Sequence, residues 1–151
     1  MIAGGLGSFE PRKPQIENLS DFENSGVHYM VKDPDQFEGK ELVISGGGDS
    51  ALDWAVYFAE KNSFVHLVHR SDRFRAHKDS LAKAYELEKQ GKMKIHTFAE
   101  VKHLNGNGQL ETIIIETKEE STAIDTALWF PLFGLSPKLG PIGKWGLQIE
   151  K

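Results

Sequence analysis

The chain has 151 residues, no cysteine and a formal net charge of −4. Its length suits one domain, and the lack of cysteine excludes a disulfide scaffold, a thiolate metal site and a thiol nucleophile within it. The acidic balance argues against a nucleic-acid partner. The longest apolar run, residues 127–133, is far shorter than the ~20 residues of a membrane span. No secretory signal is visible, so we expect a soluble cytoplasmic domain.

Little regular structure is predicted before residue 41. Residues 1–4 resemble the end of a strand, and Pro11 and Pro14 favour an extended stretch after them. Turns are expected at residues 24–26 and 34–39, with a short strand at residues 27–31 between them.

From residue 41 the pattern predicts a strand, a helix and a second strand. Residues 41–45 contain a short apolar run, and apolar residues from Ala51 to Ala59 then recur on one helical face. Residues 64–69 form the second apolar run. This order is typical of a right-handed βαβ crossover between parallel strands.

The remaining elements predict a mixed architecture. A helix is expected at residues 77–90, ended by Gly91, and a strand at residues 93–97. The Asn-Gly-Asn-Gly run at 105–108 predicts a hairpin between strands 100–104 and 109–117. A strand follows at 123–130, and then a tail with little room for a regular element. The fold class is α/β: a Rossmann-like parallel sheet flanked by helices, with a small antiparallel β-meander.

A glycine-rich turn joins the first of these strands to its helix. Gly46-Gly47-Gly48-Asp49-Ser50-Ala51 fits G-x-G-x-x-A, the dinucleotide fingerprint in its strand–turn–helix context. Gly46 would make the tight turn, Gly48 would admit a pyrophosphate, and Ala51 would keep the helix close to the sheet. The helix N-terminus would offer N–H groups to the anion. The alternative is a glycine-rich turn that binds nothing.

The end of the second strand indicates which dinucleotide is bound. NAD sites place an acidic residue there, but this strand ends at His69 and is followed by Arg70-Ser71-Asp72-Arg73-Phe74-Arg75. Guanidinium groups bind phosphate through paired charge-assisted hydrogen bonds, so the loop favours the 2′-phosphate of NADP. Ser71 offers a further donor, and Asp72 is expected to orient an arginine. The alternative is a solvated loop with internal ion pairs.

Other chemistries find no motif in the chain. The six histidines show no HExxH and no tight cluster, so no metal site is expected, and no serine lies in a G-x-S-x-G elbow. Asp53 is interpreted as an ordinary helix charge. We therefore assign no catalytic residue.

Residues 46–78 carry a resemblance to a known family. GGGDSALDWA and VHLVHRSDRFRAHK resemble the NADPH-binding domain of thioredoxin-reductase-like ferredoxin (flavodoxin)–NADP reductases. That family's HRRDxFRA loop is matched at residues 69–76, except that Ser71 replaces the second arginine. Disulfide-reducing relatives carry a CxxC pair here, but residues 28–34 contain no cysteine, so a thioredoxin reductase is excluded.

The resemblance implies a set of cofactor-binding residues. Gly46, Gly48 and Ala51 would hold the pyrophosphate, and Arg70 and Arg75 the 2′-phosphate, with Arg73 or Ser71 as partial compensation for the missing arginine. The candidate cofactor-binding residues are Gly46, Gly47, Gly48, Asp49, Ser50, Ala51, His69, Arg70, Ser71, Arg73, Arg75 and Gly134.

The resemblance also implies a place in a larger flavoprotein. Residues 1–151 would form a single NADP-binding domain, with residues 1–15 and 135–151 as connections to an FAD-binding domain absent from this chain. The whole enzyme would pass hydride from NADPH to FAD and electrons to ferredoxin or flavodoxin, as a possible homodimer. Alone, the chain would bind NADP(H) without turnover.

Two alternatives stay open. The chain could be a non-catalytic NADP-sensing module, or the NADPH domain of another flavin-dependent pyridine-nucleotide oxidoreductase. The segments 129–133 and 145–147 are too apolar for a free end, which favours contact with a flavin domain over the sensing module.

Overall fold

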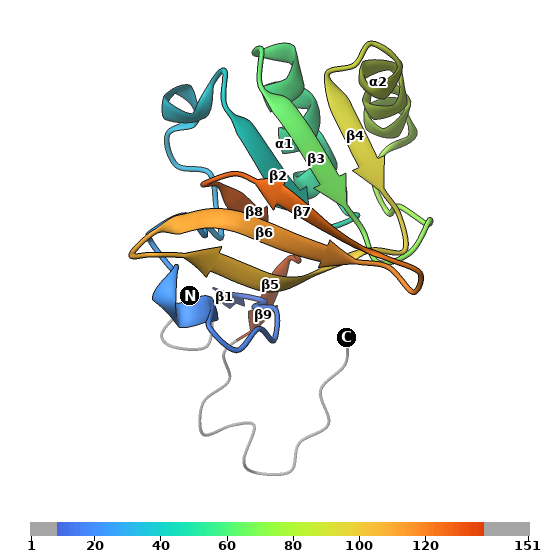
Figure 1. Cartoon of the computed structure of the whole chain (residues 1–151). Helices are drawn as coiled ribbons and strands as arrows, with labels where there is room; N and C mark the ends of the chain where they lie inside the picture. Colours follow the sequence, from blue (N-terminus) through green and yellow to red (C-terminus); the bar gives the residue numbers. More distant parts are fainter. Residues whose placement is uncertain (1–8, 138–151) are drawn as a thin grey trace.

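The computed structural model describes residues 9–137, which are arranged in three layers (Figure 1). A four-stranded parallel sheet lies between two helices on one face and a three-stranded antiparallel meander on the other. The meander strands run across the direction of the parallel strands in this view. The predicted fold class is confirmed.

The parallel sheet contains the predicted strand–helix–strand unit. Its strand order is β4-β3-β2-β8, and each neighbouring pair is parallel. The strands are β2 (Glu41–Ser45), β3 (Phe64–Val68), β4 (Met93–His96) and β8 (Trp129–Pro131). Helix α1 (Asp49–Glu60) connects β2 to β3, and α2 (Lys78–Lys89) connects β3 to β4. Apart from β8, these bounds agree with the sequence predictions to within a residue or two at each end.

The apolar face predicted for α1 is the face that the helix buries. Its buried side chains are Ala51, Leu52, Ala55, Val56, Phe58 and Ala59. They pack on the sheet with Leu42, Ile44 and Leu67. Helix α2 buries only Ala84 and Leu87, because it lies over β4 at the edge of the sheet and faces solvent on the other side. The removal of this apolar surface from water stabilises the helical layer.

A second core lies between the parallel sheet and the meander. The meander consists of β5 (Glu100–Gly106), β6 (Leu110–Glu116) and β7 (Ser121–Asp125), paired antiparallel in that order. Its inward side chains include Leu104, Leu110 and Ile113, which pack with Val43 and Trp129 of the parallel sheet. The hairpin predicted at 105–108 is confirmed.

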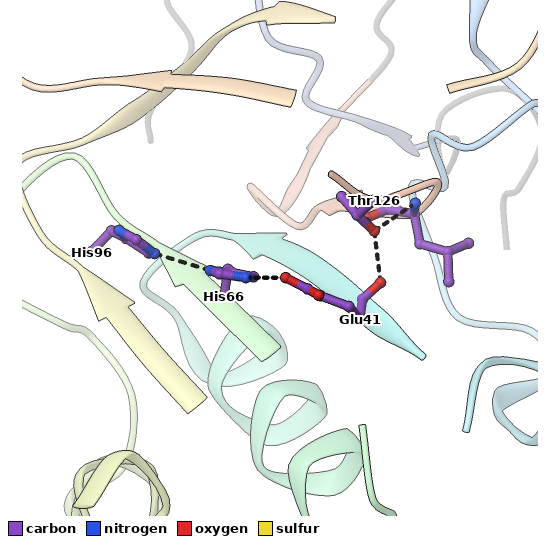
Figure 2. Close-up of polar contacts among 5 residues, drawn as sticks. Glu41, His66, His96 and Thr126 are labelled. Carbon is purple, nitrogen blue, oxygen red and sulfur yellow. Dashed lines mark hydrogen bonds and ion pairs between the residues drawn. The ribbon is translucent and has the colours of Figure 1, made fainter. Parts of the chain in front are cut away.

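The predicted single strand at 123–130 is wrong, because the chain leaves one sheet for the other at this point. Residues up to Asp125 belong to β7, and residues from Trp129 belong to β8. Between them, the Thr126 hydroxyl donates to the Glu41 carbonyl at 2.6 Å and accepts from the Leu128 N–H at 3.2 Å (Figure 2). A local side-chain cap of this kind competes with the strand ladder and breaks it.

The apolar segment 129–133, interpreted as either core or a surface for a missing flavin domain, belongs mostly to the core of the described residues. Trp129 and Phe130 are fully buried within this domain, and Leu132 is 9% exposed. Phe133, 42% exposed, remains at the surface. The apolar character of this segment therefore comes mostly from the domain's own core, while residues 145–147 lie outside the described residues.

Two further predictions differ from the structure. In place of a strand at 27–31, Val27 forms isolated bridges to Glu23 and Trp129, and short 3-10 helices lie at η2 (Leu19–Asp21) and η3 (Pro34–Phe37). The tail is predicted to have little room for a regular element, but β9 (Leu135–Pro137) pairs antiparallel with β1 (Phe9–Pro11). The strand expected at residues 1–4 lies outside the described residues.

Two of the histidines that are well separated in the sequence lie together on neighbouring strands. His66 Nδ1 of β3 is 3.2 Å from His96 Nε2 of β4, and His66 Nε2 is 2.7 Å from the Glu41 carboxylate (Figure 2). Over residues 9–137, no group of three or more histidine and acidic side chains is placed to hold a metal ion. Neither described helix is long and apolar enough to cross a membrane.

The Trp129–Ser45 contact predicts a large loss of stability on substitution. The Trp129 indole donates to the Ser45 hydroxyl at 2.9 Å, and both side chains are buried. Trp129→Phe should lower the free energy of unfolding by about 2–4 kcal/mol, because it leaves a cavity and an unpaired hydroxyl. Urea unfolding measures this loss. Trp54→Phe on the partly exposed side of α1 is the matched control, and an equal cost for the two variants would contradict the prediction.

The histidine pair predicts a pH dependence of stability. Burial, and then the neighbouring His66 and Lys94, lower the pKa of His96 from 6.5 to about 4. The unfolded chain therefore binds more protons in this range, and the free energy of unfolding should fall as pH falls from about 6.5 to about 4. His96→Asn should flatten this slope. The matched control is His103→Asn, since the His103 side chain is 65% exposed; equal slopes for both variants would refute the assignment. Burial also lowers the pKa of His28, so part of the slope should remain in His96→Asn.

Candidate functional site: a glycine turn and an arginine loop

The glycine turn at the end of β2 allows two backbone segments to approach each other closely. Gly46 has φ +137°, and a Cβ there would lie 2.4 Å from the Leu132 carbonyl oxygen and 3.1 Å from the Ala51 Cβ. Positive φ and this contact both require glycine. A small residue at 51 is also required, because α1 starts directly beneath the turn.

Gly48 faces open space at the start of α1. A Cβ there would meet no described atom within 4 Å, and Gly48 has φ −95°, which any residue can adopt. Gly48 is the N-cap of α1, and no side chain caps the helix. The first N–H groups of α1 therefore face a space that an anion could fill, with the positive end of the helix dipole behind them.

Gly47 lies against the His69 imidazole from the end of β3. A Cβ at Gly47 would lie 2.4 Å from two atoms of that ring. The missing side chain at position 47 is therefore explained by its contact with His69. The ring also packs against Phe74 at 4.8 Å between centroids.

The loop between β3 and α2, residues 69–77, is hydrogen-bonded to the glycine turn and the start of α1. The Arg75 N–H donates to the Gly47 carbonyl at 2.6 Å. The His77 N–H donates to the Asp49 carboxylate at 2.8 Å, and His77 Nε2 lies 3.6 Å from the same carboxylate. Asp49, a predicted cofactor-binding residue, thus joins the N-terminus of α1 to that of α2.

The arginine side chains of this loop extend into solvent. Arg70, Arg73 and Arg75 are all exposed. None of the three forms an ion pair with another residue in the described range 9–137, and neither does the exposed Asp72. The alternative of a loop held by internal ion pairs is therefore not what the structure shows, and the loop presents three guanidinium groups that form no ion pair within residues 9–137.

The other predicted residues have separate environments. Ser50 is exposed in the first turn of α1. Gly134 has φ +89° and accepts the Arg12 N–H at 3.0 Å, so its described contact is with the chain before β2 and not with the glycine turn. Asp53, interpreted as an ordinary helix charge, accepts a hydrogen bond from Ser80 of α2 at 2.8 Å.

Sequence reasoning missed the contribution of the chain after β8. The Leu132 N–H donates to the Ser45 carbonyl at 2.8 Å, and the Leu132 carbonyl lies against Gly46. Phe133 then stands 42% exposed beside this contact. No local signal could have shown this, because residues 45 and 132 are far apart in the sequence and the contact is made by backbone atoms.

Comparison with known proteins places this geometry in a family. Ferredoxin--NADP reductase 2 of Christiangramia forsetii is 54% identical over 153 residues, a match that covers 99% of this chain and 43% of that protein. The ferredoxin--NADP reductase of Flavobacterium johnsoniae is 52% identical over 150 residues, with 99% and 43% covered. The chain thus spans less than half the length of these curated relatives.

Solved structures support the fold, and a family profile shows the membership. The thioredoxin reductase of T. acidophilum has a TM-score of 0.80 at 19% identity, covering 95% of this chain and 47% of its own. That of Lactococcus lactis has a TM-score of 0.77 at 22% identity, covering 91% and 46%. The profile of the pyridine nucleotide-disulphide oxidoreductases matches residues 1–150. The chain therefore belongs to the pyridine nucleotide-disulphide oxidoreductase family.

Proposed function

We propose that this chain is the NADP(H)-binding domain of a ferredoxin (flavodoxin)–NADP reductase. The observation that carries the proposal is the position of three exposed arginines that form no ion pair within residues 9–137, on a loop hydrogen-bonded to the glycine turn that opens α1. A dinucleotide with a 2′-phosphate carries a pyrophosphate, which the glycine turn would bind, and a separate 2′-phosphate, which the arginine loop would bind.

The pyrophosphate would lie over Gly48. The open space there, the uncapped start of α1 and the N–H groups of its first turn form an anion site. Gly46, Gly47 and Ala51 would support this site from below, because they allow the turn, the His69 ring and the helix to pack closely. Ser50 would add a hydroxyl donor at the same end of the helix.

The 2′-phosphate would bind to the arginine loop at the end of β3. Arg70 and Arg75 are the residues that the family loop assigns to this group, and Arg73 would add a third positive charge. Each guanidinium can donate two parallel hydrogen bonds to a phosphate. The end of β3 carries no carboxylate to bind a free 2′-hydroxyl, which favours NADP over NAD.

The activity of the whole protein is a further part of the proposal. The chemistry supplied by bound nicotinamide and flavin is hydride transfer from NADPH to FAD, followed by single-electron transfer to ferredoxin or flavodoxin. This chain would bind and orient NADPH, with an FAD-binding domain in cis reached through residues 1–15 and 135–151. A homodimer and a cytoplasmic location stay predictions.

The relatives favour this function over the alternatives. The proteins that match at 54% and 52% identity are named ferredoxin--NADP reductases, and more than half of their length lies outside the match. That remaining length leaves room for a flavin-binding domain. These relatives disfavour a sensing module. Segment 129–133 no longer does so, because most of it is buried among the described residues themselves.

Nucleotide titration tests the arginine assignment. We expect NADP⁺ and 2′-phospho-AMP to bind in calorimetry and NAD⁺ to bind more weakly. Arg70→Ala and Arg75→Ala should each weaken NADP⁺ binding by about ten- to a hundredfold, as the loss of a charge-assisted bond predicts, and should leave NAD⁺ binding unchanged.

Lys40→Ala, at an exposed residue directly before β2, is the matched charge control for this titration. It removes one positive charge at the end of β2 opposite the glycine turn and should leave both affinities unchanged. Equal binding of NADP⁺ and NAD⁺ by the wild-type chain would remove the role of the arginine loop, and binding of neither would refute the proposed site.

Two glycine substitutions separate the turn from the anion site. Gly48→Ser should leave stability unchanged or raise it, because serine caps a helix, but should weaken nucleotide binding by at least tenfold, because it fills the open space. Gly46→Ala should instead lower the free energy of unfolding by more than about 2 kcal/mol, since its Cβ would clash at positive φ. Thermal unfolding and calorimetry on both variants measure these effects, and unchanged nucleotide affinity in Gly48→Ser would contradict the pyrophosphate position.

A further inference from the structure

The arginine loop keeps a defined shape although its charged side chains do not hold it. The six residues 70–75 contain three arginines and one carboxylate, Asp72, so positive charge dominates and repels itself. None of the four charged groups forms an ion pair within residues 9–137. Other groups must therefore fix the backbone. The contacts that do so converge on Arg73 and Arg75.

Both backbone polar groups of Arg73 are held by side chains from the same loop. Its N–H donates to the Ser71 hydroxyl oxygen at 3.2 Å. Its carbonyl oxygen lies 2.8 Å from His69 Nε2. Because a carbonyl oxygen only accepts, Nε2 must carry the hydrogen in this contact. The Ser71 hydroxyl is also 3.3 Å from the same nitrogen and 3.4 Å from the Arg73 carbonyl oxygen.

The His69 ring is in turn fixed by its own packing. It lies against the backbone of Gly47, where a Cβ would overlap it, and against the Phe74 ring. Its backbone is held as well, since the His69 N–H donates to the His96 carbonyl and the His69 carbonyl accepts from Ala99. With the bond from Arg75 to Gly47, the loop is closed onto the glycine turn at two points.

We propose that Ser71 and His69 are positioning residues that preform the arginine loop for a 2′-phosphorylated nucleotide, and that Ser71 does not itself bind the phosphate. The hydroxyl closes the turn 71–73, and its one donor hydrogen, which a phosphate would need, has the Arg73 carbonyl as its partner inside the loop. Preforming the loop removes an ordering cost that binding would otherwise carry. This inference rests on the proposed function, because it assumes that the loop binds the 2′-phosphate.

The proposal also accounts for a serine where the family loop has arginine. An arginine at 71 would add a guanidinium but has no acceptor for the Arg73 N–H. The chain therefore exchanges one phosphate-binding charge for a bond that fixes the loop backbone at Arg73. On this view, Ser71→Arg would loosen the loop although it adds a positive charge.

The test uses Ser71→Ala, with Ser71→Thr as the matched variant that retains the hydroxyl. Amide hydrogen exchange of residues 70–75 is measured in the nucleotide-free protein, and NADP⁺ and NAD⁺ affinities by calorimetry. Ser71→Ala should speed exchange at Arg73 and weaken NADP⁺ binding about three- to tenfold, without changing NAD⁺ binding. Ser71→Thr should restore both values. Thermal unfolding of each variant shows that the fold is kept.

The outcomes separate this inference from the proposed function. If NADP⁺ affinity falls while exchange in the free protein is unchanged, Ser71 is a direct phosphate ligand and the inference is overturned. If exchange speeds up but the preference for NADP⁺ is unaltered, the loop shape does not determine selection and the inference is again overturned. If the wild-type protein binds no NADP⁺, the proposed function itself fails.

Discussion

The candidate site depends on the close contact between the β3–α2 loop and the glycine turn. Gly47 carries no side chain, so the His69 ring can lie directly on its backbone, and the Gly47 carbonyl remains free to accept the Arg75 N–H. A side chain at position 47 would separate the two loops. The proposed anion site at Gly48 and the arginines would then no longer be held beside each other, as binding of one dinucleotide to both would require. This contact joins the turn that precedes α1 to the loop that follows β3.

Closure of the site on its other side depends on β8, which arrives from far along the chain. Thr126 ends the meander and directs the chain onto the sheet edge next to β2. Trp129 then reaches Ser45, and the Leu132 backbone lies against Gly46. The meander and the parallel sheet thus share one core, and the turn that opens α1 is supported from that core as well as from the helix. The meander is therefore part of the structure that supports the glycine turn.

Local patterns predicted the elements around the site well, because each depends on neighbours in sequence. The apolar run of β2, the helical spacing of α1 and the Asn-Gly turn of the meander are all properties of short segments. The interpretation failed where a distant group intervened. Thr126 breaks an apparently continuous strand by bonding to Glu41, and β1 pairs with β9 across nearly the whole chain. The histidines at 66 and 96 are likewise brought together only by the pairing of β3 with β4.

The sequence alone determined the fold class, the position of the glycine turn and the presence of a basic loop after the second strand, because composition and spacing specify these directly. The tertiary structure decided what each residue does there. It showed that Gly47 accommodates His69, that Asp49 joins two helix ends, and that Ser71 closes a turn while the arginines remain exposed. These roles depend on which atoms of separate segments come within hydrogen-bonding or van der Waals distance, and that proximity is a property of the packed chain.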